Sequence, residues 1–437
     1  MKIDNIHRVY FLGIGGIGMS ALARYFLLHG KQVFGYDLTP SDITSQLAIE
    51  GAHIHFDEDI GNIPENVDLA VFTPAVKKQH AAYQYFKNHN ISLLKRSEVL
   101  GMVCQDFPTI AVAGTHGKTT TTAMITQILA NSNYKTLSFI GGIAKNFDSN
   151  IVFNPQYETV IVEADEYDRS FLSLRPQIAI ITSIDADHLD VYGTYQKMKE
   201  SFQLFANQIQ PSGTLVIYDA IADQIEHPNK VLYGFSEKAK YRIDNTHNFP
   251  LPGKHNALNA MAALAACIEF SAWRDNDVEF SKLRSAFTKK LSLFKGVKRR
   301  FDIRIERNDF VYIDDYAHHP EAIIAFLEAV KSQFPNKKLT GIFQPHLYSR
   351  TRDFAHQFAN ALEVLDEIIL LDVYPAREEP IEGISSGFLL SLIKNENKKI
   401  LKKGELISYL RYSKPEILLT MGAGDIDKLA QDIESIS

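Results

Sequence analysis

The stretch AVAGTHGKTTTTAMI, residues 111–125, constrains the fold of this chain more than any other. A buried-type apolar run, PTIAVAG, leads into it, and the segment after Gly117 has helix-like spacing, which predicts a strand, a glycine turn and a helix. Gly114 and Gly117 let backbone amides turn inward, and a helix N-terminus favours anions. Lys118 could reach the β- and γ-phosphates of a nucleotide, and the Thr119 hydroxyl could bind Mg²⁺. The stretch therefore predicts a nucleotide-phosphate site in an α/β fold.

Length and charge limit the class of protein. A chain of 437 residues predicts about three domains. With 46 Lys and Arg against 52 Asp and Glu, the net charge of −6 argues against nucleic acid as the main partner. No apolar run is long enough for a membrane span, and no signal peptide is evident, so we expect no membrane partner and a cytoplasmic location. Cys104 and Cys267 are expected to be buried thiols in a reducing compartment.

Apolar runs separated by helical patterns divide the chain into three α/β parts. The predicted domains are a Rossmann-like domain over 1–104, a P-loop ATPase-like domain with a parallel sheet over 105–297, and a second Rossmann-like domain over 298–437. The predicted strands lie in RVYFLGI, QVFGYDL and DLAVFTPAV, then PTIAVAG, TVIVEADE, PQIAIITSI and GTLVIYD, then DFVYIDDY, KLTGIFQP, EIILLDVYP and EILLTMGAG.

Acidic residues at two predicted strand ends suggest a magnesium site. VIVEADEYD places Glu163, Asp165 and Glu166 after an apolar strand, and SIDADHLDVY does the same for a segment that contains His188. A single carboxylate there is commonly a helix cap. Two such clusters beside a phosphate loop favour oxygen ligands for Mg²⁺.

The first glycine run, GIGGIG, is ambiguous by itself. It fits a dinucleotide fingerprint in which Asp37 accepts hydrogen bonds from a ribose, but also a site for another nucleotide diphosphate, or a structural turn. The third part places Asp315, His318, His346 and Arg350 at strand ends, where open α/β sheets bind ligands. Zinc is disfavoured there because no cysteine cluster accompanies the histidines.

The motifs together resemble the Mur ligases, enzymes that add amino acids to the peptidoglycan precursor. GTHGKTTTT, EADEYD, DADHLDVY, KHNALNAMAA, GVKRRFD, DDYAHHP and MGAGDI occur in the order seen in that family. GIGGIGMSALA, DDYAHHP and FQPHLYSRT most resemble the members that join L-alanine to UDP-N-acetylmuramate. The resemblance implies ATP and Mg²⁺ as cofactors, and an acyl phosphate intermediate with release of ADP and phosphate.

The resemblance also implies roles for individual residues. ATP would be bound by Gly114, Thr115, His116, Gly117, Lys118, Thr119, Thr120, Asn256, Asn259, Arg300 and Asp315. The UDP-sugar and the other substrate groups would be bound by Gly15, Gly16, Gly18, Asp37, Thr73, Arg96, His188 and His319. The metal ligands would be Thr119, Glu163 and His188, and the catalytic residues Lys118, Asp315, His346 and Arg350. The third domain would bind the amino acid and complete the ATP site.

Three alternatives remain open from the sequence, one of them a non-catalytic nucleotide sensor. A recycling ligase of the same family, which attaches a murein tripeptide to UDP-N-acetylmuramate, shares EADEYD, although FQPHLYSRT favours the alanine enzyme. An NAD-dependent oxidoreductase would explain the first glycine run but not the GKTT loop or the acidic clusters. Leu347 departs from the members that add L-alanine, which often have arginine at this position. We expect a monomer or a homodimer.

Overall fold

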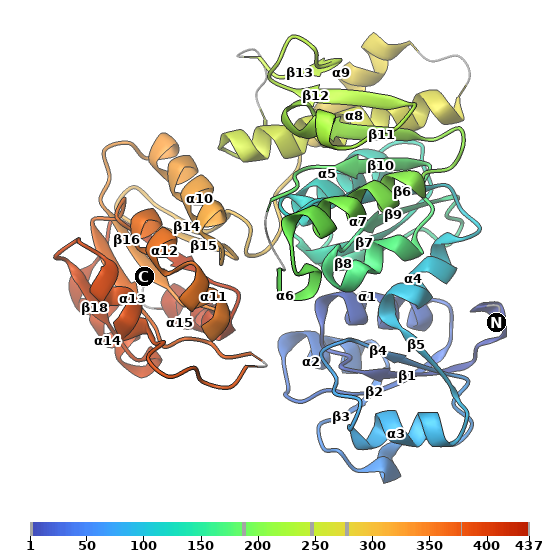
Figure 1. Cartoon of the computed structure of the whole chain (residues 1–437), viewed down its shortest axis with the longest axis horizontal. Coiled ribbons are helices and arrows are strands. Elements are labelled where there is room, and N and C mark those ends of the chain that lie inside the picture. Colours follow the sequence, from blue (N-terminus) through green and yellow to red (C-terminus); the bar gives the residue numbers. More distant parts are fainter. Residues whose placement is uncertain (1–2, 186–188, 245–248, 276–278, 377, 436–437) are drawn as a thin grey trace. The chain divides into compact units, whose positions relative to one another are not determined.

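The protein is described by a computed structural model of residues 3–185, 189–244, 249–275, 279–376 and 378–435 (Figure 1). It divides into two compact units. The first unit comprises Met1–Pro250 and Leu258–Lys295, and the second comprises Leu251–Ala257 and Gly296–Ser437. Among the described residues, no helix is sufficiently long and apolar to cross a membrane. The domain boundaries at 104/105 and 297/298 stay predictions.

The first sheet is parallel, with strand order β3-β2-β1-β4-β5. The chain adds β2 and β3 on one side of β1 and then β4 and β5 on the other side, so a topological switch point lies at β1. The glycine run directly follows this strand. The strands are β1 (Arg8–Leu12), β2 (Gln32–Tyr36), β3 (His53–His55), β4 (Leu69–Phe72) and β5 (Ser92–Lys95). The helical elements are η1 (Ile3–Asn5), α1 (Ile17–Leu28), α2 (Asp42–Ile49), η2 (Ile60–Asn62), α3 (Ala81–Asn88) and α4 (Arg96–Cys104).

The second sheet has the order β13-β12-β11-β10-β6-β9-β7-β8 and is parallel except for the β7–β8 hairpin. Its strands are β6 (Thr109–Ala113), β7 (Thr136–Ala144), β8 (Ser149–Phe153), β9 (Thr159–Glu163), β10 (Ile178–Ile181), β11 (Thr214–Tyr218), β12 (Lys230–Gly234) and β13 (Tyr241–Arg242). Its helical elements are α5 (Lys118–Ala130), η3 (Tyr167–Ser173), α6 (Leu189–Tyr192), α7 (Tyr195–Asn207), η4 (Asp219–Gln224), α8 (Lys254–Arg274) and α9 (Phe280–Leu291).

The third sheet has the order β14-β15-β19-β16-β17-β18, and only the pairing of β14 with β15 is antiparallel among the described strands. Its strands are β14 (Asp302–Glu306), β15 (Val311–Asp315), β16 (Leu339–Phe343), β17 (Glu367–Leu370), β18 (Lys398–Ile400) and β19 (Ile417–Met421). Its helical elements are α10 (Pro320–Gln333), α11 (Tyr348–Asp353), α12 (Ala355–Leu362), α13 (Ser386–Leu392), α14 (Lys403–Ser413), η5 (Asp425–Leu429) and α15 (Ala430–Ser435).

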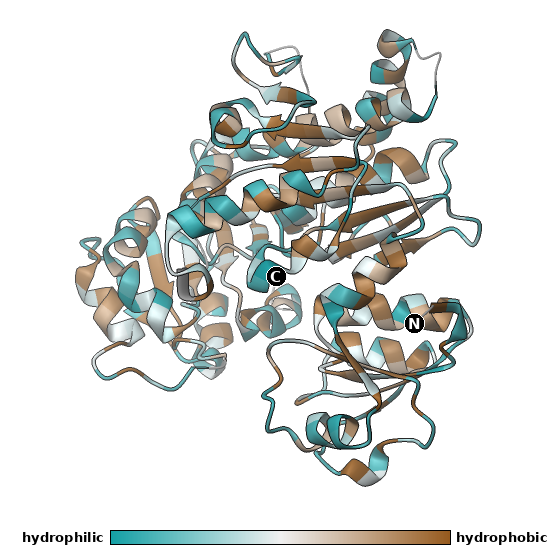
Figure 2. Ribbon diagram, turned by 45° about the vertical axis from the view of Figure 1, so that its right-hand side comes forward, coloured by the Kyte–Doolittle hydropathy of each residue, from teal (hydrophilic) through white to brown (hydrophobic). Residues whose placement is uncertain are grey.

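Buried strands form the cores of both units, and in Figure 2 the strands are mostly brown while many helices and loops are teal. β6, β10 and β19 are buried along their whole length, as expected for parallel sheets covered on both faces. The first two sheets share one hydrophobic cluster, which includes Phe11 of β1 and Val162 of β9. In the third sheet, Ile313 and Tyr312 belong to separate clusters, as alternation along a strand requires. The predicted three-domain α/β fold is confirmed.

Candidate functional site

The predicted phosphate loop connects β6 to α5, and its backbone requires glycine at two positions. Gly114 has φ +133° and Gly117 has φ +80°, both in the region that side chains disfavour. A Cβ on Gly114 would lie 2.0 Å from Oγ1 of Thr182, and one on Gly117 would lie 2.2 Å from Oδ1 of Asn259. The loop therefore lies directly against its neighbours, and α5 begins at Lys118 with its amides facing that loop.

Polar side chains that follow β10 form hydrogen bonds with the phosphate loop. The Thr115 hydroxyl lies 2.8 Å from Oγ of Ser183 and donates to Asp185 at 3.0 Å. The His116 amide donates to Oγ of Ser183 at 2.9 Å. Nε2 of His116 lies 3.7 Å from Asp185. Since β6 and β10 are adjacent parallel strands, these contacts join the polar residues at their carboxyl ends.

Lys118 is folded back into its own loop. Its Nζ donates to the Gly114 carbonyl at 2.7 Å and to the Glu166 carboxylate at 2.9 Å. Burial by itself lowers the pKa of Lys118, but the nearby carboxylates, Glu166 first and then Asp165 and Glu163, raise it above the ordinary value. The ammonium is therefore charged at neutral pH.

Glu163, at the end of β9, forms the oxygen-rich corner of the loop. Its carboxylate accepts hydrogen bonds from the Thr119 hydroxyl at 3.1 Å and from the Gly141 amide at 3.0 Å. A hydroxyl and a carboxylate beside a phosphate loop suit Mg²⁺, so these residues fit the metal site predicted for them. The third predicted ligand, His188, lies outside the described residues.

The two asparagines predicted on the adenine side have different surroundings. Asn259 is buried in α8, where its Oδ1 accepts a hydrogen bond from Thr121 at 3.3 Å. Asn259 therefore packs directly against the backbone of Gly117. Asn256 is also buried, and its Nδ2 donates to the Pro252 carbonyl at 2.8 Å in the second unit. Thr120 is buried in the first turn of α5.

The predicted sugar-nucleotide residues lie at the carboxyl edge of the first sheet. Gly15 and Gly16 follow β1, Asp37 follows β2, Thr73 follows β4 and Arg96 follows β5. The Gly15 amide donates a hydrogen bond to the Asp37 carboxylate at 2.7 Å, so this carboxylate helps to fix the glycine loop that follows β1. A Cβ on Gly18 would lie 3.1 Å from Nη1 of Arg96, which places the guanidinium beside the start of α1. The edge combines glycine amides, a helix N-terminus and one arginine.

Two ion pairs join this edge to the acidic loop after β9. Arg96 lies 3.2 Å from Asp165, and Lys95 lies 2.6 Å from Asp168. Asp168 and the next residue, Arg169, have φ +51° and +56°. The ion pairs thus hold a segment of left-handed, non-glycine backbone, which is costly unless its surroundings fix it.

Asp315 ends β15 in the second unit. It accepts hydrogen bonds from the amides of Phe301 at 2.6 Å and Ala317 at 2.8 Å. Burial raises the pKa of Asp315 to about 6, although Arg300 and the two amides oppose this rise. Arg300 lies over the Tyr316 ring at 4.9 Å from its centroid. Asp315 and Arg300, each predicted to contact ATP, therefore lie close enough for the guanidinium to act on the carboxylate.

Arg299, the neighbour of Arg300, serves the internal structure of the second unit. Its Nη2 donates to the Gly422 carbonyl at 2.5 Å, and its guanidinium lies 3.4 Å from both Asp314 and Asp427. The charge of Arg299 is therefore paired with carboxylates of its own unit. Arg300 is accordingly the stronger candidate of the two for a nucleotide contact.

His346 and Arg350 lie together after β16. Nη1 of Arg350 is 3.5 Å from Nδ1 of His346, and the His346 ring stacks on Tyr374 at 5.8 Å between centroids. The His318 ring lies 6.0 Å from that of His346. Leu347 has φ +69°, which is strained for a leucine, so this turn is held in an uncommon backbone conformation.

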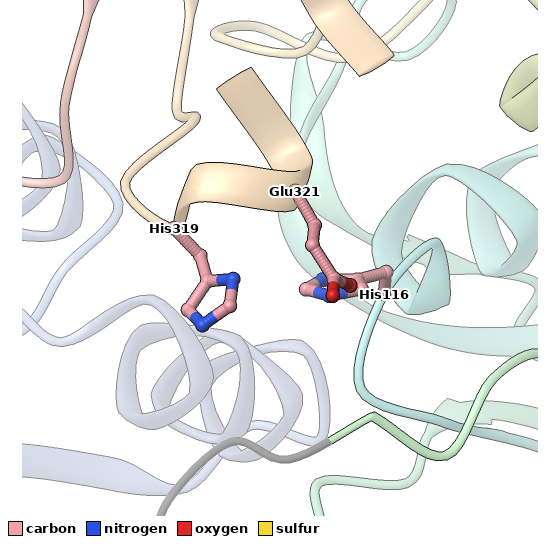
Figure 3. Close-up of side chains that lie close together, drawn as sticks. All are labelled: His116, His319 and Glu321. Atoms are coloured by element: carbon pink, nitrogen blue, oxygen red, sulfur yellow. The ribbon is translucent and has the colours of Figure 1, made fainter. Parts of the chain in front are cut away.

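His319 and Glu321 lie at the start of α10, as Figure 3 shows, with His319 as the N-cap and Glu321 in the first turn. The third labelled residue, His116, belongs to the loop before α5. His319 is buried at the N-cap and packs edge-on against Phe354 at 4.8 Å. Pro320 occupies the first helical position, where its missing amide hydrogen is not needed. The DDYAHHP motif therefore leads from the carboxyl end of β15 into helix α10.

Several residues of the site were not assigned roles from the sequence. Ser183 holds the loop, Gly141 leaves room for Glu163, and Glu166 binds Lys118. Glu166 was visible as part of the acidic cluster, but no sequence signal indicated which carboxylate meets the lysine. Serine and glycine in these strands have no distinguishing pattern.

Comparison with known proteins identifies the family of the chain. Residues 8–108 match the model described as the Mur ligase family, catalytic domain; residues 112–267 match the Mur ligase middle domain; residues 299–424 match the Mur ligase, glutamate ligase domain. UDP-N-acetylmuramate–L-alanine ligase of Flavobacterium psychrophilum is 46% identical over 453 residues, covering 99% of each chain. The protein of the same name from Flavobacterium johnsoniae is 43% identical, covering 100% of this chain and 99% of its own.

Solved structures give the same result. The UDP-N-acetylmuramate–alanine ligase of Thermotoga maritima superposes with a TM-score of 0.82 at 26% identity, covering 98% of both chains. A murein peptide ligase from Psychrobacter arcticus shares the fold, with a TM-score of 0.70 at 22% identity and 98% coverage of both chains. Since the first sheet also matches a Mur ligase model, the oxidoreductase alternative no longer has support. The chain belongs to the Mur ligase family.

Proposed function

We propose that the chain is an ATP-dependent ligase that joins L-alanine to the carboxylate of UDP-N-acetylmuramate, in cytoplasmic peptidoglycan precursor synthesis. The observation that carries this proposal is the 46% identity, over 99% of both chains, to a relative with that name. The phosphate loop around Lys118 and the glycine edge of the first sheet supply the sites that two nucleotide substrates need.

The chemistry explains why ATP is required. A carboxylate is a poor acylating agent because its leaving group would be oxide. A carboxylate oxygen of the sugar acid attacks the γ-phosphorus of ATP, the bond to ADP breaks, and an acyl phosphate forms. The amine of alanine then attacks the acyl carbon, loses a proton and expels inorganic phosphate. Negative charge on phosphoryl oxygens accompanies both steps, so fixed cations stabilise both transition states.

Lys118 is placed to supply such a cation, because its ammonium is charged and lies in the loop. Thr119 and Glu163 would hold Mg²⁺, which adds positive charge beside the phosphates when bound. Gly15, Gly16 and Gly18, with Arg96 beside them, would hold the diphosphate of the sugar nucleotide. Thr73 and Asp37 lie at the same edge and would contact the rest of that substrate.

The second unit would bind the amino acid and contact the nucleotide. Arg350 is suited to the alanine carboxylate, and His346, 3.5 Å from it, is suited to take a proton from the amine. Asp315 and Arg300 would contact ATP. His319 is the second candidate for the proton acceptor, since it lies at the start of the neighbouring helix α10.

The test is phosphate release from ATP in the presence of UDP-N-acetylmuramate and Mg²⁺, across a panel of amino acids and the murein tripeptide. We expect release with L-alanine and a loss on the order of 10²-fold or more in the Lys118→Ala variant. Release only with the tripeptide would favour the recycling ligase instead. No release with any acceptor would contradict the proposal.

A further inference from the structure

Two glutamates at the end of β9 face different groups of the phosphate loop. Glu163 contacts the Thr119 hydroxyl and the Gly141 amide. Glu166, three residues later, contacts Lys118, with its two carboxylate oxygens 2.9 and 2.8 Å from Nζ. The magnesium assignment uses Glu163 and leaves Glu166 without a role.

The ion pair between Glu166 and Lys118 is buried. The Glu166 side chain is 0% exposed and that of Lys118 is 14% exposed. In surroundings that exclude water, two opposite charges at hydrogen-bond distance interact much more strongly than at the surface. Any ligand that takes the ammonium away from Glu166 must therefore compensate for this interaction.

The backbone fixes Glu166 where it is. Its carbonyl accepts hydrogen bonds from the buried Tyr192 hydroxyl at 2.5 Å and from the Arg169 amide at 2.9 Å. Asp168, in the left-handed turn that follows, is held by Lys95 at 2.6 Å. A carboxylate held this firmly cannot retreat far when a second anion approaches Lys118.

We propose that Glu166 is a tethered competitor for Lys118: it neutralises the ammonium in the empty loop, weakens the hold of the loop on nucleotide phosphates, and speeds the departure of ADP. The proposal deepens the proposed function, because it rests on the assignment of this loop to phosphates. Lys118 binds Glu166 through the same hydrogens that phosphate oxygens would accept. Glu166 thus acts as a positioning residue through Lys118.

The test uses Glu166→Gln, which keeps the shape and one acceptor oxygen but removes the charge. The matched control is Glu158→Gln, the same substitution just before β9, at a half-exposed glutamate that pairs with Lys135 and Arg274 and does not contact Lys118. Binding of ADP and of inorganic tripolyphosphate is measured by calorimetry in EDTA, so that metal does not contribute. We expect Glu166→Gln to bind both ligands at least about tenfold more tightly, and the control to bind them about as the unsubstituted protein does.

Turnover gives a second readout. Tighter binding of ADP predicts that Glu166→Gln lowers KM for ATP and lowers kcat, whereas simple damage to the loop would raise KM. In the background of Lys118→Met, the Glu166→Gln change should no longer tighten phosphate binding, because the shared ammonium is gone. Glu166→Asp keeps the charge but withdraws it by one methylene, so its affinity should lie between those of Glu166→Gln and the unsubstituted protein.

The outcomes separate this inference from the proposed function. If the unsubstituted protein binds neither ADP nor tripolyphosphate, the phosphate loop assignment fails, and this inference fails with it. If it binds them but folded Glu166→Gln binds no more tightly, only the role of Glu166 is overturned. Should Glu166→Gln not fold, Glu166→Asp decides: affinity equal to or weaker than that of the unsubstituted protein overturns the inference.

Discussion

Gly141 lies in β7, next to β9 in the second sheet, and its missing side chain leaves room for the Glu163 carboxylate. A Cβ at this position would lie 2.2 Å from one of the Glu163 oxygens. Gly141→Ala must therefore displace the proposed metal ligand, and we expect a loss of about 10²-fold or more in phosphate release, with the protein still folded.

Gly404→Ala is the matched control for this change. Gly404 lies in α14, and no atom lies within 4 Å of the Cβ it would gain. We expect unchanged activity and slightly higher stability, since alanine favours helices. Both variants are compared by phosphate release and circular dichroism. Full activity of Gly141→Ala would show that Glu163 does not need its observed position.

Asp315 offers a prediction about pH. Burial raises the pKa of Asp315 to about 6, from 3.8 for an exposed aspartate. The folded protein therefore binds this proton more tightly than the unfolded chain, and ionisation between these two values costs stability as pH rises. In Asp315→Asn this cost is absent. We expect the Tm of the second unit in the variant to rise relative to that in the unsubstituted protein from about pH 4 to about pH 6, and the difference to stay constant above that range.

Calorimetry at several pH values checks this expectation. The lost hydrogen bond to one of the amides lowers the Tm of the variant at every pH and so does not affect the trend. A Tm difference that is independent of pH, or that shrinks as pH rises towards 6, would contradict a raised pKa for Asp315.

At the scale of elements, the β7–β8 hairpin joins the second sheet to helix α1 of the first. Asn150 of β8 is 0% exposed, accepts a hydrogen bond from Arg24, and donates to the Ile17 carbonyl at 2.7 Å and to Ser20 at 2.9 Å. Arg24 also pairs with Glu50 at 2.8 Å. The buried side-chain amide of Asn150 thus forms hydrogen bonds with three residues of α1, which packs on the first sheet.

Asn150→Ala leaves these groups without their partner in a buried place. We expect a loss of about 2–4 kcal/mol in the free energy of unfolding of the first unit, measured with urea. Asn207→Ala, at an exposed position in α7, is the control and should change stability by less than about 0.5 kcal/mol. An effect of Asn150→Ala no larger than that of the control would mean that the hairpin contact adds nothing.

The elements that carry the site were predictable because sequence and sheet position coincide there. Each apolar run ends where a polar motif begins, as at Ala113 before the GTHGKT loop, and parallel strands bring these ends to one edge. The partner of Lys118 could not be predicted in this way. Glu166, which contacts the ammonium, is followed by a turn in which Asp168 and Arg169 adopt left-handed conformations. No glycine in the sequence indicates this turn.

Contacts between distant segments were also beyond sequence reasoning. Arg24 and Asn150 are 126 positions apart, and neither lies in a motif. Their pairing follows from the packing of α1 against the β7–β8 hairpin, which is a property of the assembled fold. Motifs therefore located the groups that contact substrates, whereas the residues that hold those groups emerged only from the structure.

At the scale of the whole molecule, each of the two compact units has its own hydrophobic core. One cluster joins the first and second sheets through side chains such as Phe11 and Val162, while the clusters around Ile313 and Tyr312 belong to the third sheet. Chains with separate cores commonly depart from two-state unfolding. We therefore expect two calorimetric transitions, and Asn150→Ala should lower only the transition of the first unit.

A ligand of the phosphate loop should then stabilise one transition selectively. Tripolyphosphate lacks the adenosine that the second unit is proposed to contact, so its binding energy should appear in the first unit, which contains Lys118. At a hundredfold excess over its Kd, binding adds about 2.7 kcal/mol, which raises that Tm by several degrees. The shift should vanish in Lys118→Met, while both transitions remain. A single transition, or an equal shift of both, would show that the two cores unfold together and that the units depend on each other for stability.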